Sequence, residues 1–488
     1  MLHPRFENTY ARLPARFYTR TEPTPVKAPR LIRFNASLAR ELGIEMDAGD
    51  EEGIAQALSG NQIMPGSEPL AMAYAGHQFG QFVPQLGDGR AILLGEVRGR
   101  DGRLRDIHLK GAGRTPFSRG GDGRAALGPV LREYVVSEAM TALGIPSTRS
   151  LAAVATGATV LREEPLPGAI LTRIAASHVR VGTFQFFAAR EDFDAVRTLA
   201  DYVIGRHYSD ITSAANPYLE LLNAVMRRQA SLVAKWLHVG FIHGVMNTDN
   251  YTISGETIDY GPCAFMDVYD ANQVFSSIDR HGRYAYSNQP SIAQWNLVRF
   301  AETLLPLIDA SQERAVELAT ESINAFAAEM DLQWLKGMRA KLGLKSEDPR
   351  DRDLGQQLLA IMERTQADFT LTFRDLCGMA DSSETRTQGA LGEDGEFQKW
   401  LADWKSRCAV EPQSGAERAA AMRAVNPRYI PRNHRIEELI AAAVGGDFAP
   451  FDRFMAVLTK PFDEQSEFEA YAAPPRPEQR VEQTFCGT

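Results

Sequence analysis

HGVMNTDN at residues 243–250, followed by DYG at residues 259–261, is the stretch of this sequence that decides the expected fold. The segment between them, YTISGETI, predicts two short strands joined by a turn at Ser254-Gly255. In such a hairpin Asn250 lies opposite Asp259, and opposed residues have Cα atoms only about 4.5–5.5 Å apart. One amide oxygen and one carboxylate at the open end of a hairpin are hard oxygen ligands, which predicts a Mg²⁺ site.

Asp249 precedes this oxygen pair and is free to act on a proton. A loop Asp, a metal-binding Asn and the Asp of a D-[FY]-G motif, in this order, form the second half of the protein-kinase signature. An isolated Asp-Asn or DYG is more often a surface turn without a metal, so the predicted register of Asn250 and Asp259 is what favours a functional site. His243 opens the same loop, and we expect it to hold the loop by hydrogen bonds.

A lysine lies upstream, in a position typical of the small lobe of kinases. The apolar runs at residues 91–97 and 104–109 predict a hairpin, with Lys110 at the exit of its second strand. A helix is predicted from about Leu127 to Leu143, with Pro129 tolerated in its first turn and Gly144 as its stop. This order of strand, lysine, loop and helix builds the lysine–glutamate ion pair of kinases.

Two glutamates of the predicted helix compete for the ion pair with Lys110. Helical periodicity places Leu131, Val135 and Glu138 on one stripe, which favours Glu138 as the inward-facing acid. Glu133 lies on another face, and the sequence pattern alone does not settle the choice.

Glycine-rich turns and arginines predict anion binding around Lys110. A kinase-type G-x-G-x-x-G loop does not precede this lysine; instead, two GDGR turns flank it, at residues 87–90 and 121–124. Glycine lets backbone N–H groups approach an anion, and an arginine adds a forked donor. Arg173 and Arg180 lie in an apolar stretch and need an anionic partner, because burying an unpaired guanidinium is costly. A carboxylate would satisfy them as well as a phosphate would.

The chain resembles the selenoprotein O family, also called the YdiU family, of kinase-fold protein adenylyltransferases. The resemblance covers nearly the whole chain, and its long blocks are highly specific. In chain order, the blocks begin with HQFG at His77, LGDGRAILLGEV at Leu86, LKGAGRTPFSRGGDGRA at Leu109, REYVVSEA at Arg132 and LTRIAASHVRVGTF at Leu171. HGVMNTDN, DYGPCAFMD, the segment after Arg280 and NPRYIPRNH at Asn426 extend the likeness.

The resemblance implies an α+β, protein kinase-like bilobal fold, with a strand-rich small lobe, a helical large lobe and a helical C-terminal extension. It implies transfer of AMP from ATP to a Ser, Thr or Tyr hydroxyl of a protein, with ATP bound in the reverse of the kinase orientation. Asp249 is then the proton acceptor, Asn250 and Asp259 hold Mg²⁺ or Mn²⁺, and Glu133 pairs with Lys110. The residues implied in ATP binding are Gly87, Gly89, Arg90, Lys110, Asp122, Gly123, Arg173, Arg180 and Asp259. An unperturbed Asp has a pKa of about 3.9 and a nearby metal lowers it further, so we expect Asp249 mainly to orient the hydroxyl and to take its proton late.

Composition indicates an ordinary soluble globular protein. The length of 488 residues is enough for two or three domains. A hydrophobic content of 44% and a charged content of 24% are ordinary for such a protein. A net charge of −9 argues against general nucleic-acid binding. Apolar runs stay short of the roughly 18–20 residues of a membrane span. The arginine-rich N-terminus also holds Glu7, Glu22 and several prolines, so we expect a bacterial cytoplasmic protein rather than one with a targeting peptide.

The pattern changes along the chain and predicts three parts. Residues 1–186 are expected to hold an N-terminal segment and the strand-rich small lobe, 187–400 the helical large lobe, and 401–488 a helical extension and tail. A polar stretch from Ala380 to Phe397 predicts a linker or exposed loop.

Four cysteines are too few and too scattered for a disulfide scaffold or a zinc site. The resembled family often places a cysteine or selenocysteine near the C-terminus, as Cys486 is here, and can link it to a cysteine after D-[FY]-G. Phe275 stands where that partner is often found, and Cys263 is the cysteine that this segment holds. We therefore expect all four cysteines to be reduced thiols. Whether Cys486 forms a regulatory disulfide is not decided by the sequence.

Three functions remain after this reading. The preferred one is a protein adenylyltransferase that uses ATP and a divalent cation. The second is a conventional kinase with the same residues, and the third is a non-catalytic pseudokinase that binds nucleotide as a scaffold. The complete set of Lys110, Asp249, Asn250 and Asp259 speaks against the third.

Overall fold

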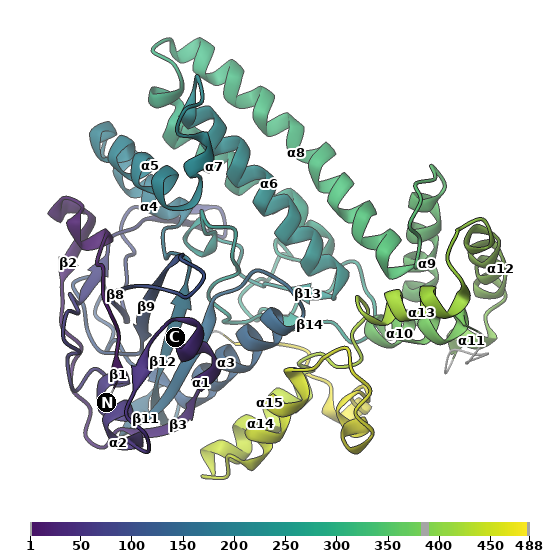
Figure 1. Cartoon of the computed structure of the whole chain (residues 1–488), viewed down its shortest axis with the longest axis horizontal. Helices are drawn as coiled ribbons and strands as arrows, with labels where there is room; N and C mark the ends of the chain where they lie inside the picture. Colours follow the sequence, from purple (N-terminus) through teal and green to yellow (C-terminus); the bar gives the residue numbers. More distant parts are fainter. Residues whose placement is uncertain (1, 382–389, 486–488) are drawn as a thin grey trace.

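The computed structural model of the chain describes residues 2–381 and 390–485. These residues form a mixed α and β structure, in which a large antiparallel sheet is followed along the chain by a series of helices (Figure 1). The strands are β1 (Leu2–His3), β2 (Tyr18–Arg20), β3 (Arg30–Phe34), β4 (Glu45–Met46), β5 (Leu70–Met72), β6 (Gly76–Gln78), β7 (Gln81–Val83), β8 (Ala91–Arg98), β9 (Leu104–Lys110), β10 (Ala125–Ala126), β11 (Arg149–Leu161), β12 (Pro165–Ala175), β13 (Phe241–Ile242) and β14 (Ala264–Phe265). The predicted mixture of strands and helices is confirmed.

Helices interrupt the strand-rich part and then dominate. The first four are α1 (Ala36–Glu41), α2 (Glu51–Leu58), α3 (Leu127–Ala142) and α4 (Val181–Ala188). The later ones are α5 (Phe193–His207), α6 (Pro217–His238), α7 (Gln289–Ile308), α8 (Gln312–Lys341), α9 (Asp351–Thr365), α10 (Phe369–Ala380), α11 (Ala390–Glu393), α12 (Gly395–Ala409), α13 (Gly415–Arg423), α14 (Asn433–Val444) and α15 (Ala449–Leu458). Residue 186, where the sequence suggested a boundary, lies inside α4.

The sheet places Lys110 at its centre. Its eight described strands run in the order β2-β5-β8-β9-β12-β11-β3, and β10 pairs with β12. Lys110 at the end of β9 lies opposite Ala91 of β8 and Leu171 of β12. Arg173 lies opposite His108 in the same register. Because residues two apart on a strand point to the same face, Lys110 and Arg173 leave the sheet on one side.

Both faces of the sheet are covered, which explains its nearly continuous apolar strands. Leu93 and Leu171 belong to the large core that also contains the inner residues of α3. Ile92 and Ile170, their chain neighbours, belong to a smaller core with α1 and α2 on the opposite face. Adjacent strand residues thus enter different cores, as the alternation of a strand requires.

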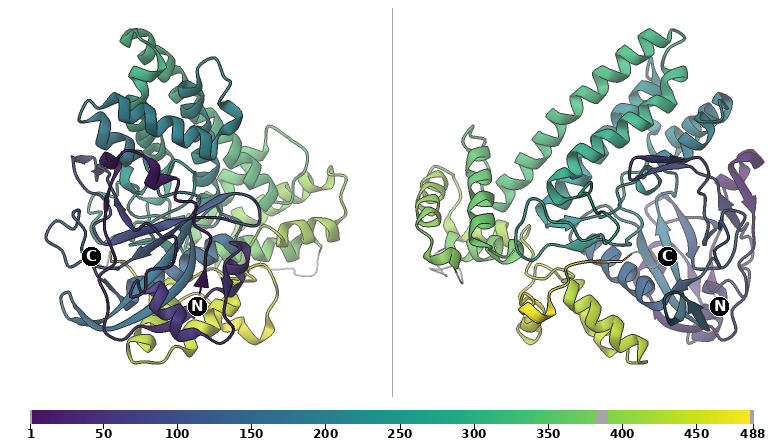
Figure 2. Two further views of the ribbon diagram at one scale, coloured as in Figure 1. Left: turned by 60° about the vertical axis from the view of Figure 1, so that its left-hand side comes forward. Right: turned by 180° about the vertical axis from the view of Figure 1, so that it is seen from behind.

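The helices lie on two sides of this sheet. α6, α7 and α8 pack along one another and form the long arm at the top of Figure 1. α14 and α15 pack against α3, so this helix lies between the sheet and the C-terminal part of the chain. The second view of Figure 2 shows the segment after α15 running from these helices back toward the sheet.

Several predicted elements are confirmed with their bounds nearly unchanged. The predicted hairpin is β8 and β9, and the predicted helix after Lys110 is α3. The helical patterns before and after the catalytic motif correspond to α5, α6, α7 and α8. His243 holds its loop by hydrogen bonds as expected, donating from its backbone N–H to Gln289 Oε1 and from Nε2 to the Ile258 carbonyl.

The predicted hairpin between Asn250 and Asp259 is wrong. Thr252 forms an isolated bridge with Arg180, and Thr257 forms one with Ser147, so the two arms pair with other segments rather than with each other. Within the segment, Thr252 Oγ1 donates to the Glu256 carbonyl and accepts from its backbone N–H, which closes a compact loop. Neighbouring segments satisfy the backbone groups that the hairpin would have used.

The end of the described chain lies against the segment after DYG. Thr484 forms a parallel bridge with Ser276, its N–H donates to the Phe275 carbonyl at 2.7 Å, and its Oγ1 donates to the Pro262 carbonyl at 2.6 Å. Cys263, Cys377 and Cys408 are buried free thiols. Cys486 lies outside the described residues, as does the part of the predicted linker at 382–389; the described end of that linker contains α11.

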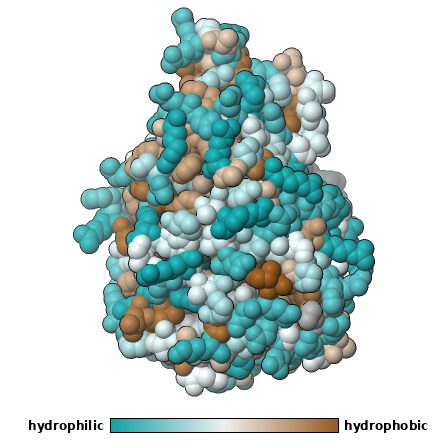
Figure 3. Space-filling view, turned by 90° about the vertical axis from the view of Figure 1, so that its left-hand side faces the viewer, coloured by the Kyte–Doolittle hydropathy of each residue, from teal (hydrophilic) through white to brown (hydrophobic). Residues whose placement is uncertain are grey.

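Among the described helices, each is too short or too polar to cross a membrane. The face in Figure 3 is mostly hydrophilic, with hydrophobic side chains in small separate patches. Scattered hydrophobic residues of this kind are normal on a protein surface.

Candidate active site

The residues singled out in the sequence line one cavity. Its volume is about 560 Å³, within the range of small-molecule sites, and it lies where β8, β9 and β12 meet the Asp249 loop (residues 243–250) and the DYG segment. Every residue predicted to bind ATP, metal or proton lines it: Gly87, Gly89, Arg90, Lys110, Asp122, Gly123, Arg173, Arg180, Asp249, Asn250 and Asp259. Seven arginines and lysines face four aspartates in this lining, so the cavity suits an anion.

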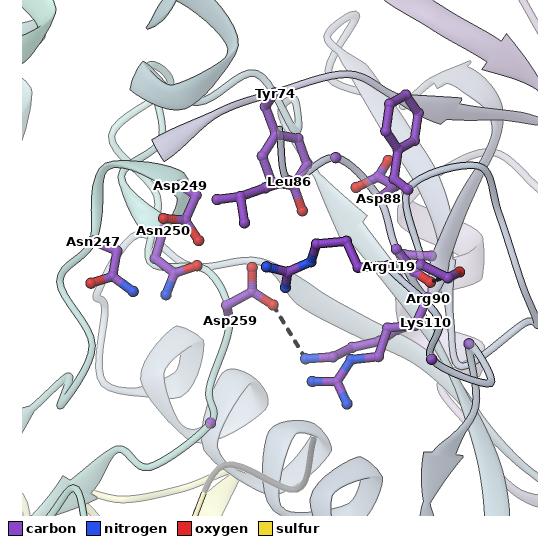
Figure 4. A pocket seen from close by; sticks show the side chains of 18 of the residues that line it. Tyr74, Leu86, Asp88, Arg90, Lys110, Arg119, Asn247, Asp249, Asn250 and Asp259 are labelled. Carbon is purple, nitrogen blue, oxygen red and sulfur yellow. Dashed lines mark hydrogen bonds and ion pairs between the residues drawn. The ribbon is translucent and has the colours of Figure 1, made fainter. Parts of the chain in front are cut away.

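A buried cluster of charges joins the sheet, α3 and the DYG segment. Lys110 Nζ lies 2.6 Å from Glu133 Oε2 and 3.2 Å from Asp259 Oδ1, the contact drawn in Figure 4. Arg173, only 2% exposed, donates to the same two carboxylates. Burial alone would raise the pKa of Asp259 and of Glu133, but Arg173 and Lys110 hold both pKa values below their ordinary range. Both acids therefore stay ionised.

Arg180 is buried with two donor atoms that form no hydrogen bond to the described residues. Its Nη atoms lie 3.6 Å from Asp88 Oδ1 and from Asp259 Oδ2, beyond hydrogen-bonding distance, and its guanidinium stacks 4.3 Å from the centre of the Tyr74 ring. Nε and Nη1 form no hydrogen bond within the described residues. Buried polar groups are nearly always satisfied, so this guanidinium has capacity for an anion in the cavity. Of the two arginines, Arg173 is hydrogen-bonded to its carboxylates, whereas Arg180 pairs with Asp88 and Asp259 only across 3.6 Å.

Asp249 lies in a 3₁₀ turn, Thr248–Asn250, at the cavity wall. Its side chain is 8% exposed, and burial raises its pKa to about 6, against a lowering by the hydrogen bond from Gln78 Nε2 at 3.2 Å. The sequence suggested an aspartate of ordinary or lowered pKa. In the folded chain Asp249 is a stronger base than a solvent-exposed aspartate, because its charge is less well solvated.

The residues predicted to hold a cation offer suitable oxygen atoms. Asn250 Nδ2 donates to the Val245 carbonyl at 2.9 Å, which leaves its amide oxygen for another ligand. Figure 4 shows the side chains of Asp249, Asn250 and Asp259 beside one another on one wall of the cavity. The described residues contain no group of three or more His, Cys, Asp or Glu side chains that would hold a metal unaided. The set fits a cation such as Mg²⁺ that completes its shell with phosphate oxygens and water.

Comparison with known proteins gives a family and several relatives. The family model of the protein adenylyltransferase SelO matches residues 1–459. A Rhizobium rhizogenes protein named protein nucleotidyltransferase YdiU is 63% identical over 486 residues, which cover 99% of this chain and 97% of that one. Proteins of the same name from Rhizobium meliloti and Rhodopseudomonas palustris are each 60% identical, with 99% and 100% of both chains covered, respectively.

The chain belongs to the SelO family. The resemblance drawn from the motifs is thereby confirmed, and with it the enzyme class, protein nucleotidyltransferase, that the family and its members carry in their names.

Within this SelO chain, the partner of Lys110 is Glu133 and not Glu138. Glu138 accepts two hydrogen bonds from the Arg149 guanidinium, both at 2.9 Å, and a third from the Ser150 N–H at 2.8 Å. The periodicity argument for Glu138 is wrong because α3 is buried around almost its whole circumference, so a single inward stripe does not exist. The choice implied by the family resemblance agrees with the observed contact.

The two GDGR turns of the SelO chain differ in what they hold. In the first, the Thr115 hydroxyl donates to the Asp88 carbonyl at 2.7 Å, which fixes the following loop over the turn. In the second, Asp122 pairs with Arg162 at 3.0 Å, while Arg124 donates to backbone carbonyls of the N-terminal segment, including that of Thr24. Both turns line the cavity, but the arginine of the second is already engaged elsewhere.

The HQFG segment that begins at His77 also contributes to the site, a role that its motif did not predict. His77 N–H donates to Thr248 Oγ1 at 2.7 Å, and Phe79 N–H donates to Asn247 Oδ1 at 3.1 Å. The motif was visible in the sequence, but its contacts span about 170 positions, and spacing carries no information over that range. Asp88 also lines the cavity, although only the glycines and the arginine of its GDGR turn were predicted to bind ATP.

Proposed function

We propose that this protein transfers AMP from ATP to Ser, Thr or Tyr hydroxyls of proteins and releases pyrophosphate. Full-length similarity to protein nucleotidyltransferases supports the reaction class. We further propose that ATP binds in reverse of the kinase orientation, with its γ-phosphate where a kinase holds adenine. The flanking GDGR turns support this orientation, because they supply glycine-rich backbone on both sides of Lys110 where a kinase has one phosphate loop.

The observation that carries the proposal is the unsatisfied Arg180. Its Nε and Nη1 are buried at the cavity wall without hydrogen-bond partners among the described residues. Arg173 and Lys110 lie beside it and share the carboxylates of Glu133 and Asp259. A triphosphate supplies the oxygen atoms that Arg180 lacks, and a leaving pyrophosphate keeps them in place.

The reaction then uses each group in a defined way. The substrate hydroxyl oxygen attacks the α-phosphorus and forms the phosphate ester, while the bond from that phosphorus to the bridging oxygen of the β-phosphate breaks. Asp249 receives the hydroxyl proton, and the electron pair leaves with pyrophosphate, whose charge Lys110, Arg173 and Arg180 stabilise. A bound Mg²⁺ or Mn²⁺, held by Asn250 and Asp259, would supply charge neutralisation at the phosphates.

We propose a protein kinase-like fold of two lobes, with a small lobe that ends near α4, a large lobe that continues to about α12 and a C-terminal extension, since the boundaries at 186 and 400 expected from the sequence fall inside these two helices. The position of the Lys110–Glu133 pair on a central strand and the following helix supports it. We also propose the bacterial cytoplasm as its compartment, supported by its bacterial relatives and by three buried free thiols in the described chain.

Labelled ATP tests the proposed function directly. The purified protein is incubated with Mg²⁺ or Mn²⁺ and ATP labelled at either the α- or the γ-phosphate, and protein-bound label is measured. We expect α-label and no γ-label in protein, and Asp259→Ala should lose the transfer. Incorporation of γ-label alone would identify a conventional kinase and refute the proposal.

A further inference from the structure

The HQFG hairpin, formed by β6 (Gly76–Gln78), β7 (Gln81–Val83) and the turn between them, is docked on the Asp249 loop. Backbone N–H groups of His77 and Phe79 donate to the side chains of Thr248 and Asn247, at 2.7 and 3.1 Å. Gln185 supports this contact, because its amide bonds both the Thr248 hydroxyl and the His77 ring. The hairpin is thus bonded to the two residues that precede Asp249, through the two residues that flank Gln78.

Gln78 stands between these two anchors and faces the cavity. Its Nε2 donates to Asp249 Oδ2 at 3.2 Å. The other oxygen, Oδ1, is buried without a hydrogen-bond partner in the described chain and lies against Gly76. Oδ2 is therefore the oxygen left to receive a proton from the cavity, and the Gln78 amide fixes its direction. A carboxylate oxygen has a second lone pair, so this bond leaves room for a substrate hydroxyl.

We propose that Gln78 is a positioning residue for the nucleotidyl transfer, acting through Asp249. This role of Gln78 rests on the proposed function, in which Asp249 is the proton acceptor. The amide holds the carboxylate plane so that Oδ2 meets the incoming hydroxyl, and the backbone bonds of His77 and Phe79 hold the amide itself. A rigid support of this kind is what brings a proton acceptor within reach of its substrate. Gln78 carries no charge, so we expect the arginines and Lys110, and not Gln78, to hold the phosphates.

The test compares Gln78→Leu with Gln81→Leu. Gln81 lies opposite Gln78 in the same hairpin and is exposed, so it is a matched control of the same residue type. We expect Gln78→Leu to lower kcat about 10- to 100-fold, less than the 10²–10⁴-fold that a general base itself supplies. The KM for ATP and the equilibrium binding of ATP should stay within twofold of wild type. Gln81→Leu should leave kcat unchanged.

A second comparison separates positioning from a general loss of structure. In an Asp249→Ala background, Gln78→Leu should cause no further loss of the residual rate, because the group it positions is gone. Gln78→Asn, which keeps the amide donor on a shorter side chain, should retain more activity than Gln78→Leu. A Gln78→Leu enzyme with wild-type kcat, a loss that falls on ATP binding, or an equal loss in the Asp249→Ala background would each overturn the inference.

The label used keeps the two proposals distinguishable. If wild-type protein transfers α-label, the comparison is made with α-label. If it transfers γ-label, the proposed function fails, but the same variants with γ-label still test whether Gln78 acts through Asp249.

Discussion

Replacing Gly76 by alanine is expected to disturb Asp249 with little effect on the rest of the chain. A Cβ at position 76 would lie 2.6 Å from Asp249 Oδ1, 2.9 Å from its Cβ and 3.0 Å from its Cγ, whereas ordinary contacts begin at 3.4 Å. Rotating the carboxylate relieves the first contact but not the second, so residue 76 and the Asp249 loop must move apart by roughly 0.5 Å. Because a misplacement of about 1 Å at a reacting group costs about 10²-fold, we expect kcat to fall roughly 10- to 100-fold. This corresponds to about 1.4–2.7 kcal/mol of activation free energy.

The assay is transfer of α-label from ATP, measured beside equilibrium ATP binding and thermal unfolding. Gly205→Ala in α5 is the matched control, because its Cβ would meet no atom within 4 Å and its φ is not positive. That variant should keep full activity and gain about 0.5–1 kcal/mol of stability, as alanine is the better helix former. The reasoning is refuted if Gly76→Ala retains wild-type kcat, or if its loss is explained by weaker ATP binding.

Three further predictions concern the charges of the chain. Glu133→Gln should lower label transfer and cost about 3–5 kcal/mol of stability, because Lys110 and Arg173 lose a buried partner. Glu138→Gln should lower stability, because Arg149 loses its partner, but should retain label transfer. Equal losses of transfer in the two variants would contradict the assignment of Glu133 as the partner of Lys110. Chelation of divalent cations should abolish label transfer without lowering the unfolding temperature, because Lys110 and Arg173 already neutralise Asp259 in the folded chain. Label transfer that persists in EDTA would exclude the proposed cation. Burial lowers the pKa of Lys341 to about 7. Between pH 7 and about pH 10 the unfolded chain therefore binds more protons at this lysine than the folded chain does. The contribution of Lys341 to stability rises with pH across this range. Lys341→Met should therefore stabilise the protein at pH 7 by an amount that shrinks by pH 9 in urea unfolding; a constant difference would show that this lysine is not buried uncharged.

A large part of the candidate site could be predicted from the sequence. Apolar runs marked β8 and β9, Pro129 and Gly144 marked the ends of α3, and the motif HGVMNTDN marked the Asp249 loop. These are local signals, since strand and helix patterns depend on residues within one or two turns of each other. The cavity-lining residues followed from such motifs together with the family resemblance, because each motif carries its chemistry in a few adjacent positions.

Contacts between distant segments were decided only by the tertiary structure. The arms of the segment after Asn250 had an acceptable turn for a hairpin, yet their backbone groups pair with the segments of Arg180 and Ser147. Periodicity favoured Glu138, but a helix buried on nearly all sides presents more than one acid to the interior, and the position of β9 selected Glu133. The hydrogen bond from Gln78 to Asp249 joins residues 171 positions apart, and no local pattern encodes it. Packing chooses among partners that are equally acceptable locally, because buried polar groups must be satisfied by whatever the fold brings within reach.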